Sequence, residues 1–420
     1  LLPGTEGGRF DAPPRPVWTA PRRLEYAQAL AAGDVDGDGH LDVFLGQYAL
    51  PYERGQMPAP FFDANDGHPG FLLRNRGDGT FEDATEAAGL AAKRRRRSYS
   101  ASFADLDGDG HLDLVVVSDF AGADVHRNDG RGRFTDVTAA WLDDPRAFGM
   151  AHALADFDAD GHEDLLVVGM NSPTADRLAA LGLDRPGVAG GAAERARLAF
   201  GNRLLFGAAD GFRQRPAGAS LARGGWAWGA GVFDADNDGY PDLYLANGHE
   251  TRVRTADYEG QFWLHDIFIA TSDPDPVAEG YFAGGFAKDR AAGRRYLFVN
   301  QRGTNFFDAA HLLGVALQAD SRNVVAADLD GDGRCELLVT TFEIWPLTRQ
   351  TLRIWRNETA AAGNWIGLRL RDARGAPAPP GTVAEIRTPR GTSRRQLVLG
   401  DSYRSQHPAA VHFGLGAEAG

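Results

Sequence analysis

Short apolar runs recur along the chain, and each lies next to a polar loop that is rich in acidic residues. Residues 102–104 and 324–327 precede such loops, whereas residues 113–117 and 164–168 follow them. The runs are too short for helices and are rich in β-branched residues, so they predict β-strands.

A second pattern follows each acidic loop and consists of an apolar run, a glycine-rich turn and a phenylalanine. It occupies residues 72–81, 125–134, 204–212 and 297–306, with a shortened copy at 352–357. Glycine at the centre of such a turn favours a tight hairpin. Each unit therefore predicts a four-stranded antiparallel blade of a β-propeller. We expect an all-β fold with five such blades, five to seven blades in total, and a small C-terminal β domain.

The acidic loops share one nine-residue pattern, which occurs at residues 34–42, 105–113, 156–164, 234–242 and 328–336. Every copy has carboxylates at positions one, three, five and nine and glycine at position six. Calcium binds roughly six to eight oxygens at about 2.3–2.6 Å, and alternate carboxylates followed by glycine allow a short loop to curl around one ion. An EF-hand closes with glutamate at position twelve instead. The pattern predicts a different calcium loop and about five bound Ca²⁺ ions.

The predicted metal ligands are the side chains at positions one, three, five and nine and the backbone carbonyl at position seven. The carboxylate ligands are Asp34, Asp36, Asp38, Asp42, Asp105, Asp107, Asp109, Asp113, Asp156, Asp158, Asp160, Asp164, Asp234, Asp236, Asp238, Asp242, Asp328, Asp330, Asp332 and Glu336. The carbonyl ligands are those of His40, His111, His162, Tyr240 and Arg334. The sequence predicts no catalytic residue and no organic cofactor.

Acidic residues outnumber basic ones by 57 to 44, which gives a formal net charge of -13. The five loops hold 20 of the 57 acids in tight clusters, whose carboxylates repel one another unless a cation is present. The acidic balance argues against nucleic-acid binding, because phosphate neutralisation needs a basic surface. No apolar run approaches the roughly 20 residues of a membrane span. The single cysteine, Cys335, cannot form an intrachain disulfide.

The loops and hairpins resemble the FG-GAP and VCBS repeats of integrin α-subunit propellers and of secreted bacterial proteins, and residues 75–85 match the latter strongly. Residues 364–370, 400–406 and 411–416 are similar to the ASPIC/UnbV domain. In this order the two features resemble the cartilage acidic protein family and its bacterial relatives. The resemblance implies an extracellular calcium-binding propeller with no established catalytic residue.

Three segments follow from these patterns. We expect residues 1–30 to form an N-terminal segment able to close the ring, residues 31–360 to form the propeller and residues 361–420 to form the C-terminal β domain.

The longest connections occupy the same place in the repeat. Because each acidic loop joins the first and second strands of a blade, the connection from the second strand to the third emerges at the opposite face. The longest of these are residues 169–203, in which 174–181 are predicted to be helical, and residues 247–296. Insertions in repeat folds often form the binding face. We therefore expect a protein or polysaccharide ligand on this side, called the insertion face.

The second insertion contains polar and aromatic residues that could form an acid–base or metal site: His249, Glu250, Tyr258, Trp263, His265 and Asp266. They match no catalytic motif, so loop packing is favoured over catalysis. Trp226 and Trp228 alternate before the fourth acidic loop, and packing within one strand is favoured there over stacking on a sugar. Residues 93–97 form a basic run, for which a solvated loop is favoured over a contact with an acidic partner.

The sequence favours an extracellular, cell-surface or periplasmic module for binding, adhesion or assembly, since weak calcium sites fill where calcium is abundant. Two alternatives stay open. One is a polysaccharide lyase or hydrolase with its site on the insertion face. The other is self-assembly into homo-oligomers or fibres.

Overall fold

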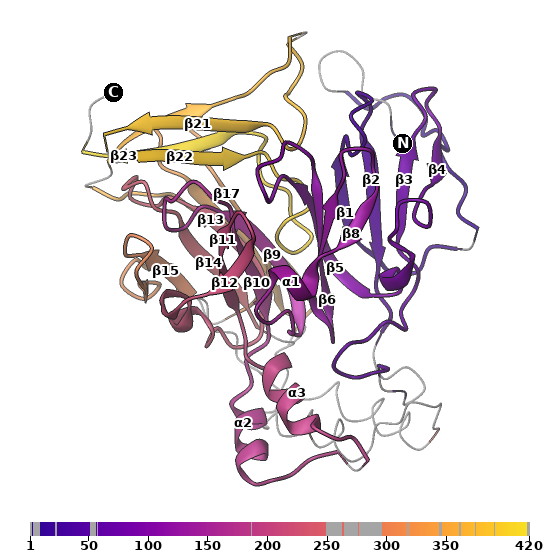
Figure 1. Cartoon of the computed structure of the whole chain (residues 1–420). Helices are drawn as coiled ribbons and strands as arrows, with labels where there is room; N and C mark the ends of the chain where they lie inside the picture. Colours follow the sequence, from indigo (N-terminus) through magenta and orange to yellow (C-terminus); the bar gives the residue numbers. More distant parts are fainter. Residues whose placement is uncertain are drawn as a thin grey trace.

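Antiparallel sheets of similar construction repeat along the chain in the computed structural model (Figure 1). The structure describes Leu2 and residues 9–417, except for 22, 51–55, 57, 186, 249–262, 264–275, 277–295, 317–318, 344–346, 361–362, 374 and 390. Among the described residues, none of the helices is both long enough and apolar enough to cross a membrane.

Five sheets, called repeat sheets 1 to 5, follow one another in sequence order. Their strands are β1 (Ala27–Gly33), β2 (Asp42–Gln47), β3 (Phe71–Asn75) and β4 (Phe81–Asp83); β5 (Arg97–Ala104), β6 (Asp113–Asp119), β7 (Gly122–Asn128) and β8 (Phe134–Asp136); β9 (Gly149–Ala155), β10 (Asp164–Gly169), β11 (Arg203–Ala208) and β12 (Gly211–Gln214); β13 (Ala227–Phe233), β14 (Asp242–Asn247), β15 (Tyr296–Asn300) and β16 (Phe306–Asp308); and β17 (Asp320–Ala327), β18 (Glu336–Glu343) and β19 (Arg349–Trp355). The fifth sheet has three strands among the described residues, where the sequence has its shortened hairpin.

The first strands of consecutive sheets pack against one another, β1 on β5, β5 on β9, β9 on β13 and β13 on β17. Apolar side chains fill the space between neighbouring sheets, as Phe44, Phe103 and Leu114 do between repeat sheets 1 and 2. The predicted fold class is therefore confirmed, because the chain is all-β and its repeat sheets have the strand order of propeller blades.

The remaining strands lie near the C-terminus. Strand β20 (Asn364–Leu368) pairs with β23 (Val411–Gly416), and β21 (Val383–Thr388) pairs with β22 (Gly391–Gln396). Figure 1 shows these strands across one end of the repeat sheets, whereas α2 (Pro173–Ala180) and α3 (Gly191–Leu198) extend from the other end. Helix α2 confirms the helix expected at 174–181, and α3 was not predicted. Short helical turns complete the described structure: α1 (Thr138–Trp141), η2 (Ala91–Lys93) and η3 (Pro216–Leu221).

A segment between β22 and β23 contacts the first strand of every repeat sheet. This central segment, residues 400–404, forms hydrogen bonds with Gln28, Ser100, His152, Ala230 and Asn323. For example, Ser402 donates its backbone N–H to the carbonyl of His152 at 2.7 Å, and Asn323 donates its side-chain amide to the carbonyl of Tyr403 at 2.8 Å. The segment therefore ties all five sheets together at the point where their first strands converge.

His152 orients one of these contacts. Its imidazole is fully buried between the hydroxyls of Ser100 and Ser102, at 2.8 and 2.9 Å. Burial lowers the pKa of His152 to about 3, so the ring is neutral at physiological pH. A neutral ring that donates to Ser100 leaves the Ser100 hydroxyl free to donate to the carbonyl of Gly400, 3.1 Å away.

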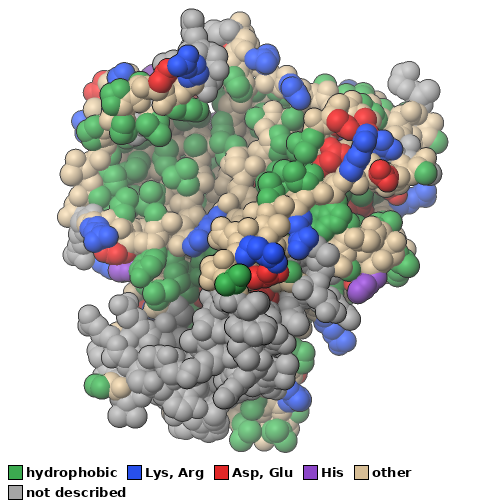
Figure 2. All heavy atoms as spheres, turned by 180° about the vertical axis from the view of Figure 1, so that it is seen from behind, with side chains coloured by type: hydrophobic (Ala, Val, Ile, Leu, Met, Phe, Trp, Pro, Cys, Tyr) green, Lys and Arg blue, Asp and Glu red, His purple; other side chains and the backbone are tan. Residues whose placement is uncertain are grey.

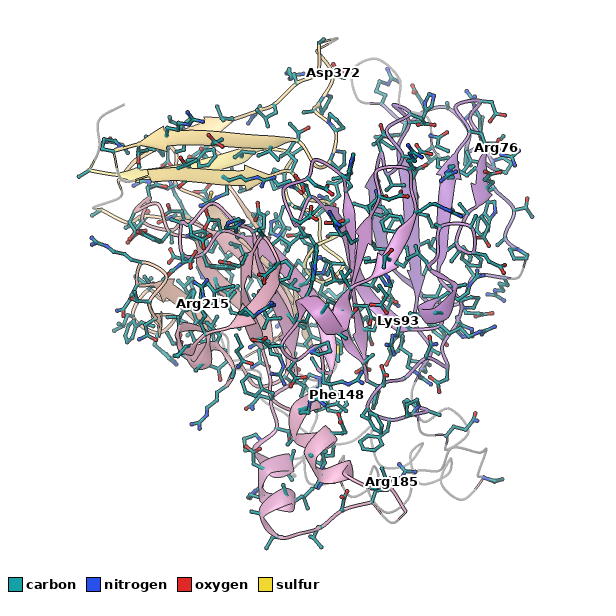
Figure 3. The ribbon with its side chains drawn as sticks, viewed as in Figure 1. Arg76, Lys93, Phe148, Arg185, Arg215 and Asp372 are labelled. Carbon is teal, nitrogen blue, oxygen red and sulfur yellow. The ribbon has the colours of Figure 1, made fainter. Side chains whose placement is uncertain are left out.

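The basic run at residues 93–97 is neither a solvated loop nor a free basic surface. Lys93 pairs with Asp124 at 2.6 Å and with Asp136 at 2.7 Å, and Arg96 pairs with the same Asp124 at 2.8 Å. Arg94 and Arg97 form further ion pairs. Figure 3 shows Lys93 at the end of the sheets nearest α2 and α3. Four of the five residues therefore form an ion-pair network, whereas Arg95 is exposed. The sequence alone did not reveal this network because the acidic partners lie far away in the chain.

Gly400 provides a test of the central segment. Its φ is +90°, and an added Cβ would lie 2.1 Å from the carbonyl oxygen of Ala101. Gly375 has a similar φ of +81° but has nothing within 4 Å of such an atom. We expect Gly400→Ala to lower the free energy of unfolding by about 2–5 kcal/mol, from backbone strain plus overpacking, and Gly375→Ala to lower it by about 1–2 kcal/mol from strain alone. Urea denaturation of both variants measures the difference, and equal losses would show that the segment is not tightly seated.

Candidate metal sites

Each acidic loop joins the first strand of a repeat sheet to the second in one register. The residue before position one pairs with the residue at position nine in all five loops, as Gly33 does with Asp42 and Ala104 with Asp113. The same nine residues therefore cross the same hairpin end in every sheet.

The position-one carboxylate shapes the loop. Asp34 accepts the backbone N–H groups of Gly37 at 2.8 Å and Gly39 at 2.9 Å. Gly39 has a φ of +88°, which favours glycine and explains its presence at position six. The other position-one carboxylates also accept loop amides: Asp105, Asp156, Asp234 and Asp328. The loop backbone thus turns around its own first carboxylate.

The position-nine carboxylate connects the loop to the second hairpin. Asp42 accepts the N–H of Val35, in the loop, at 3.2 Å and the N–H of Asn75, at the end of β3, at 2.8 Å. Corresponding pairs of bonds are formed by Asp113, Asp164 and Asp242. The acidic loop and the hairpin pattern recur together because this carboxylate hydrogen-bonds to both.

Three carboxylate groups converge in every loop, with ligand atoms within 4.8 Å of one another. The groups are Asp34, Asp36 and Asp42; Asp105, Asp107 and Asp109; Asp156, Asp158 and Asp164; Asp234, Asp236 and Asp242; and Asp328, Asp330 and Asp332. Positions one and three are present in all five groups, and the third member is position nine or position five. The structure thus brings together three of the four predicted carboxylates in each loop.

The position-five and position-seven residues have additional contacts. Asp38 accepts the N–H of His40 at 2.8 Å, and the equivalent bond occurs in all five loops. The His40 ring covers the hairpin turn at Gly77, where an added Cβ would lie 2.6 Å from the ring nitrogen. The repeat pattern predicts a role only for the His40 carbonyl, and the packing of the His40 side chain is visible only in the structure.

Arginines lie beside the position-three carboxylates. Arg127 pairs with Asp107 at 2.6 Å and Arg356 pairs with Asp330 at 2.9 Å, and Asp36 and Asp158 have equivalent partners. Among the described residues, Asp236 in the fourth loop forms no ion pair. The surface in Figure 2 also shows acidic side chains beside basic ones rather than in a separate patch.

Burial and mutual repulsion disfavour the charged carboxylates. Burial, together with the neighbouring loop carboxylates, raises the pKa of Asp42 to about 6 and that of Asp113 to about 7. The same causes raise the pKa of Asp164 to about 9. A bound cation would favour the ionised forms, since an adjacent positive charge lowers a carboxyl pKa.

Unpartnered atoms show that the loops fit a metal ion. Asp36 Oδ1, Asp158 Oδ1 and Glu336 Oε1 are buried without a hydrogen-bond partner. A buried carboxylate oxygen that lacks a partner costs about 1–3 kcal/mol or more. The donors are oxygens, which are the ligands of hard divalent cations such as calcium.

The candidate constellation on the insertion face receives no support from the described residues. Trp263 is buried against Phe148 and donates its indole N–H to Ser172 at 2.7 Å, which is a packing role. His249, Glu250, Tyr258, His265 and Asp266 lie outside the described residues.

The two tryptophans before the fourth loop also have packing roles. Trp226 and Trp228 pack against the core, and Trp228 lies between Tyr99, Tyr403 and the Arg322 guanidinium. The favoured interpretation, packing within the strand, therefore agrees with the structure.

The geometry defines an all-β repeat protein with an acidic loop at the same hairpin of every repeat sheet. Residues 61–116 and 105–167 match the family model of the FG-GAP-like repeat. The chain therefore contains FG-GAP-like repeats, and the matched residues include the second and third acidic loops.

Cartilage acidic protein 1 of Mus musculus is 21% identical over 403 residues, which are 94% of this chain and 50% of that protein. The Homo sapiens protein is 28% identical over 195 residues, 44% of this chain and 26% of that protein. The chain thus spans about half the length of the mouse relative. The predicted resemblance to FG-GAP repeats and to cartilage acidic protein is confirmed. The likeness to the ASPIC/UnbV domain stays a prediction.

An alignment with the crystal structure of the exotype rhamnogalacturonan lyase YesX covers 95% of this chain and 68% of the lyase chain, at 11% sequence identity. Its TM-score of 0.18 is too low to support any argument about fold or activity.

The fourth loop allows the structural and metal-binding carboxylates to be separated. Asp242→Ala leaves two buried N–H groups unpaired, so we expect a loss of about 2–5 kcal/mol in unfolding free energy even under chelation. Asp236→Ala removes repulsion but no ion pair among the described residues, so we expect little loss under chelation and a smaller stabilisation by calcium. Urea denaturation with chelator and with excess calcium distinguishes the two. An Asp236→Ala variant that responds to calcium like the parent would contradict its assignment as a ligand.

The raised pKa values predict how pH changes the effect of calcium. In the metal-free folded chain Asp42 and Asp113 retain protons up to about pH 6 and 7, against an ordinary value of 3.8. The stability that this protonation provides is present below about pH 4 and is lost as the pH rises through the folded pKa values. A bound calcium ion would favour the ionised carboxylates, so the calcium-bound chain would not lose this stability as the pH rises. Calorimetry should show a calcium-dependent rise in Tm that grows from about pH 5 to about pH 8; a rise that shrinks over this range would contradict the prediction.

Proposed function

We propose that the chain is an extracellular β-propeller module whose acidic loops bind calcium and whose faces bind other molecules. The observation that carries the calcium assignment is the convergence of three carboxylates in the same register in all five loops. The proposed ligands are the carboxylates and position-seven carbonyls predicted from the sequence. Five Ca²⁺ ions would change the formal charge from -13 to about -3.

Calcium would act as a structural ion. Each loop lies where the first and second strands of a sheet join. In the first four loops the position-nine carboxylate also bonds to the third strand or its end, so an ion there would stabilise three strands at once. Sites that are filled at about 100 times their dissociation constant contribute roughly 2.7 kcal/mol each. Such stabilisation suits a chain whose one cysteine, Cys335, is buried and free.

The calcium requirement supports a location outside the cytosol. Extracellular modules function with calcium affinities of about 10⁻⁴–10⁻³ M, a concentration that the cytosol does not provide. The FG-GAP-like repeats support the same location, since the resemblance implies secreted or cell-surface proteins. We propose a binding, adhesion or assembly role on this basis.

The insertion face remains the proposed surface for a protein or polysaccharide ligand. Helices α2 and α3 extend from the end of the sheets opposite the C-terminal strands (Figure 1), as expected if the long connections share one face. No described residue favours the alternative of a lyase or hydrolase.

Calcium titration tests the proposal. We expect isothermal titration calorimetry of the chelator-treated chain to show about five binding sites, and differential scanning calorimetry to show a Tm rise of many degrees. Magnesium provides the control, because its small octahedral shell suits these crowded oxygen clusters poorly. A melting temperature that neither ion changes would overturn the proposal.

A further inference from the structure

A cleft of about 810 Å³ lies between the C-terminal strands and the repeat sheets. Strands β20 and β23 form one side, and the loop-side ends of β9, β13 and β17 form the other. It therefore lies on the side of the acidic loops, away from α2 and α3. Its volume is within the range of about 300–1,000 Å³ that is typical of small-molecule sites.

Apolar side chains from both sides line the cleft. Leu154 and Val232 come from the repeat sheets, whereas Leu397 and Val411 come from the C-terminal region. Charged and polar side chains also line the cleft, so it combines apolar surface with polar groups, as sites that bind organic molecules do.

Asp401 is the polar group in this cleft whose hydrogen bonding is incomplete. Its Oδ1 is buried and has no hydrogen-bond partner, and its Oδ2 lies 4.0 Å from Nε2 of His407, which also lines the cleft. Burial raises the pKa of Asp401. A ligand that donates a hydrogen bond or carries a positive charge would therefore stabilise this carboxylate.

The neighbouring backbone holds Asp401 in place. Asp401 belongs to the central segment, in which Gly400 fits closely against Ala101 and Ser402 is bonded to His152 and Ala230. A carboxylate on such a fixed segment needs little reordering when a ligand binds.

The cleft is also lined by other charged groups: the exposed Arg369 and Arg371, Arg395, and Asp234 and Asp328 of the fourth and fifth acidic loops. Arg395 donates to the carbonyl of Arg394 at 2.9 Å, and its guanidinium lies 5.6 Å from the Phe413 ring centroid. It also interacts electrostatically with Asp234, which borders the cleft as part of the fourth acidic loop. Among the carboxylates that line the cleft, Asp401 is the one that lies outside the acidic loops.

We propose that this cleft binds a small amphiphilic amine, with its apolar body between the C-terminal strands and the repeat sheets and its ammonium group on Asp401. The proposed contact on Asp401 is separate from the proposed calcium ligands, because Asp401 belongs to none of the acidic loops, although Asp234 and Asp328 at the border of the cleft do. A bound amine would contact both regions and so stabilise their association.

Dansylcadaverine, a fluorescent naphthalene with a primary ammonium group, is a suitable probe for the 420-residue chain in a buffer that contains calcium. We expect a blue-shifted emission that saturates at micromolar concentrations. Asp401→Asn, which keeps the size of the side chain, should weaken binding at least tenfold. Asp210→Asn removes an equal charge from an exposed turn outside the cleft and should leave binding unchanged.

N-acetylated dansylcadaverine keeps the naphthalene but has no ammonium group, so it separates the contribution of the charge to binding from that of the apolar contact. It should bind the parent chain at least tenfold more weakly than the amine does, and should bind parent and Asp401→Asn equally. Ala410→Trp, at an exposed position on the edge of the cleft, should weaken both probes. Melting temperatures confirm that each variant is folded. Equal affinity of the amine for the parent and Asp401→Asn, or for the parent and Ala410→Trp, would overturn the proposal.

Discussion

Crowding of negative charge in a buried position is the constraint on which the repeat sheets depend. Three carboxylates converge at the same end of every sheet, and several are buried. They cannot be dispersed, because they also hold the backbone: Asp34 shapes its loop and Asp42 joins that loop to the hairpin at Asn75. A bound cation, as proposed, would keep both the hydrogen bonds and the charges.

The five loops meet this constraint in different ways. Arginines supplied by the neighbouring strands offset part of the charge in four loops, for example Arg127 on Asp107 and Arg356 on Asp330. Asp236 lacks such a partner among the described residues, although Arg395 interacts electrostatically with Asp234 of the same loop. The hydrogen bonds to the position-one carboxylate recur in all five loops, so they define the turn. The arginine partners differ from loop to loop, so they adjust its charge.

The C-terminal region adds a second kind of connection. Acidic loops organise each repeat sheet separately, whereas the central segment contacts the first strand of all five sheets. Gly400 permits this close approach, and the neighbouring Asp401 faces the cleft that the same region encloses. The C-terminal region therefore contacts all five repeat sheets through its central segment.

The sequence by itself determined the repeating sheets and the carboxylates that converge in them, because both depend on local spacing: strand alternation, a nine-residue loop and a glycine-rich turn. Only the tertiary structure decided how residues distant in the chain meet. The ion pairs of Lys93 and Arg96, the contact of Ser402 with His152 and the cleft around Asp401 join segments far apart in sequence. Such contacts follow from how sheets pack, and no local pattern encodes them.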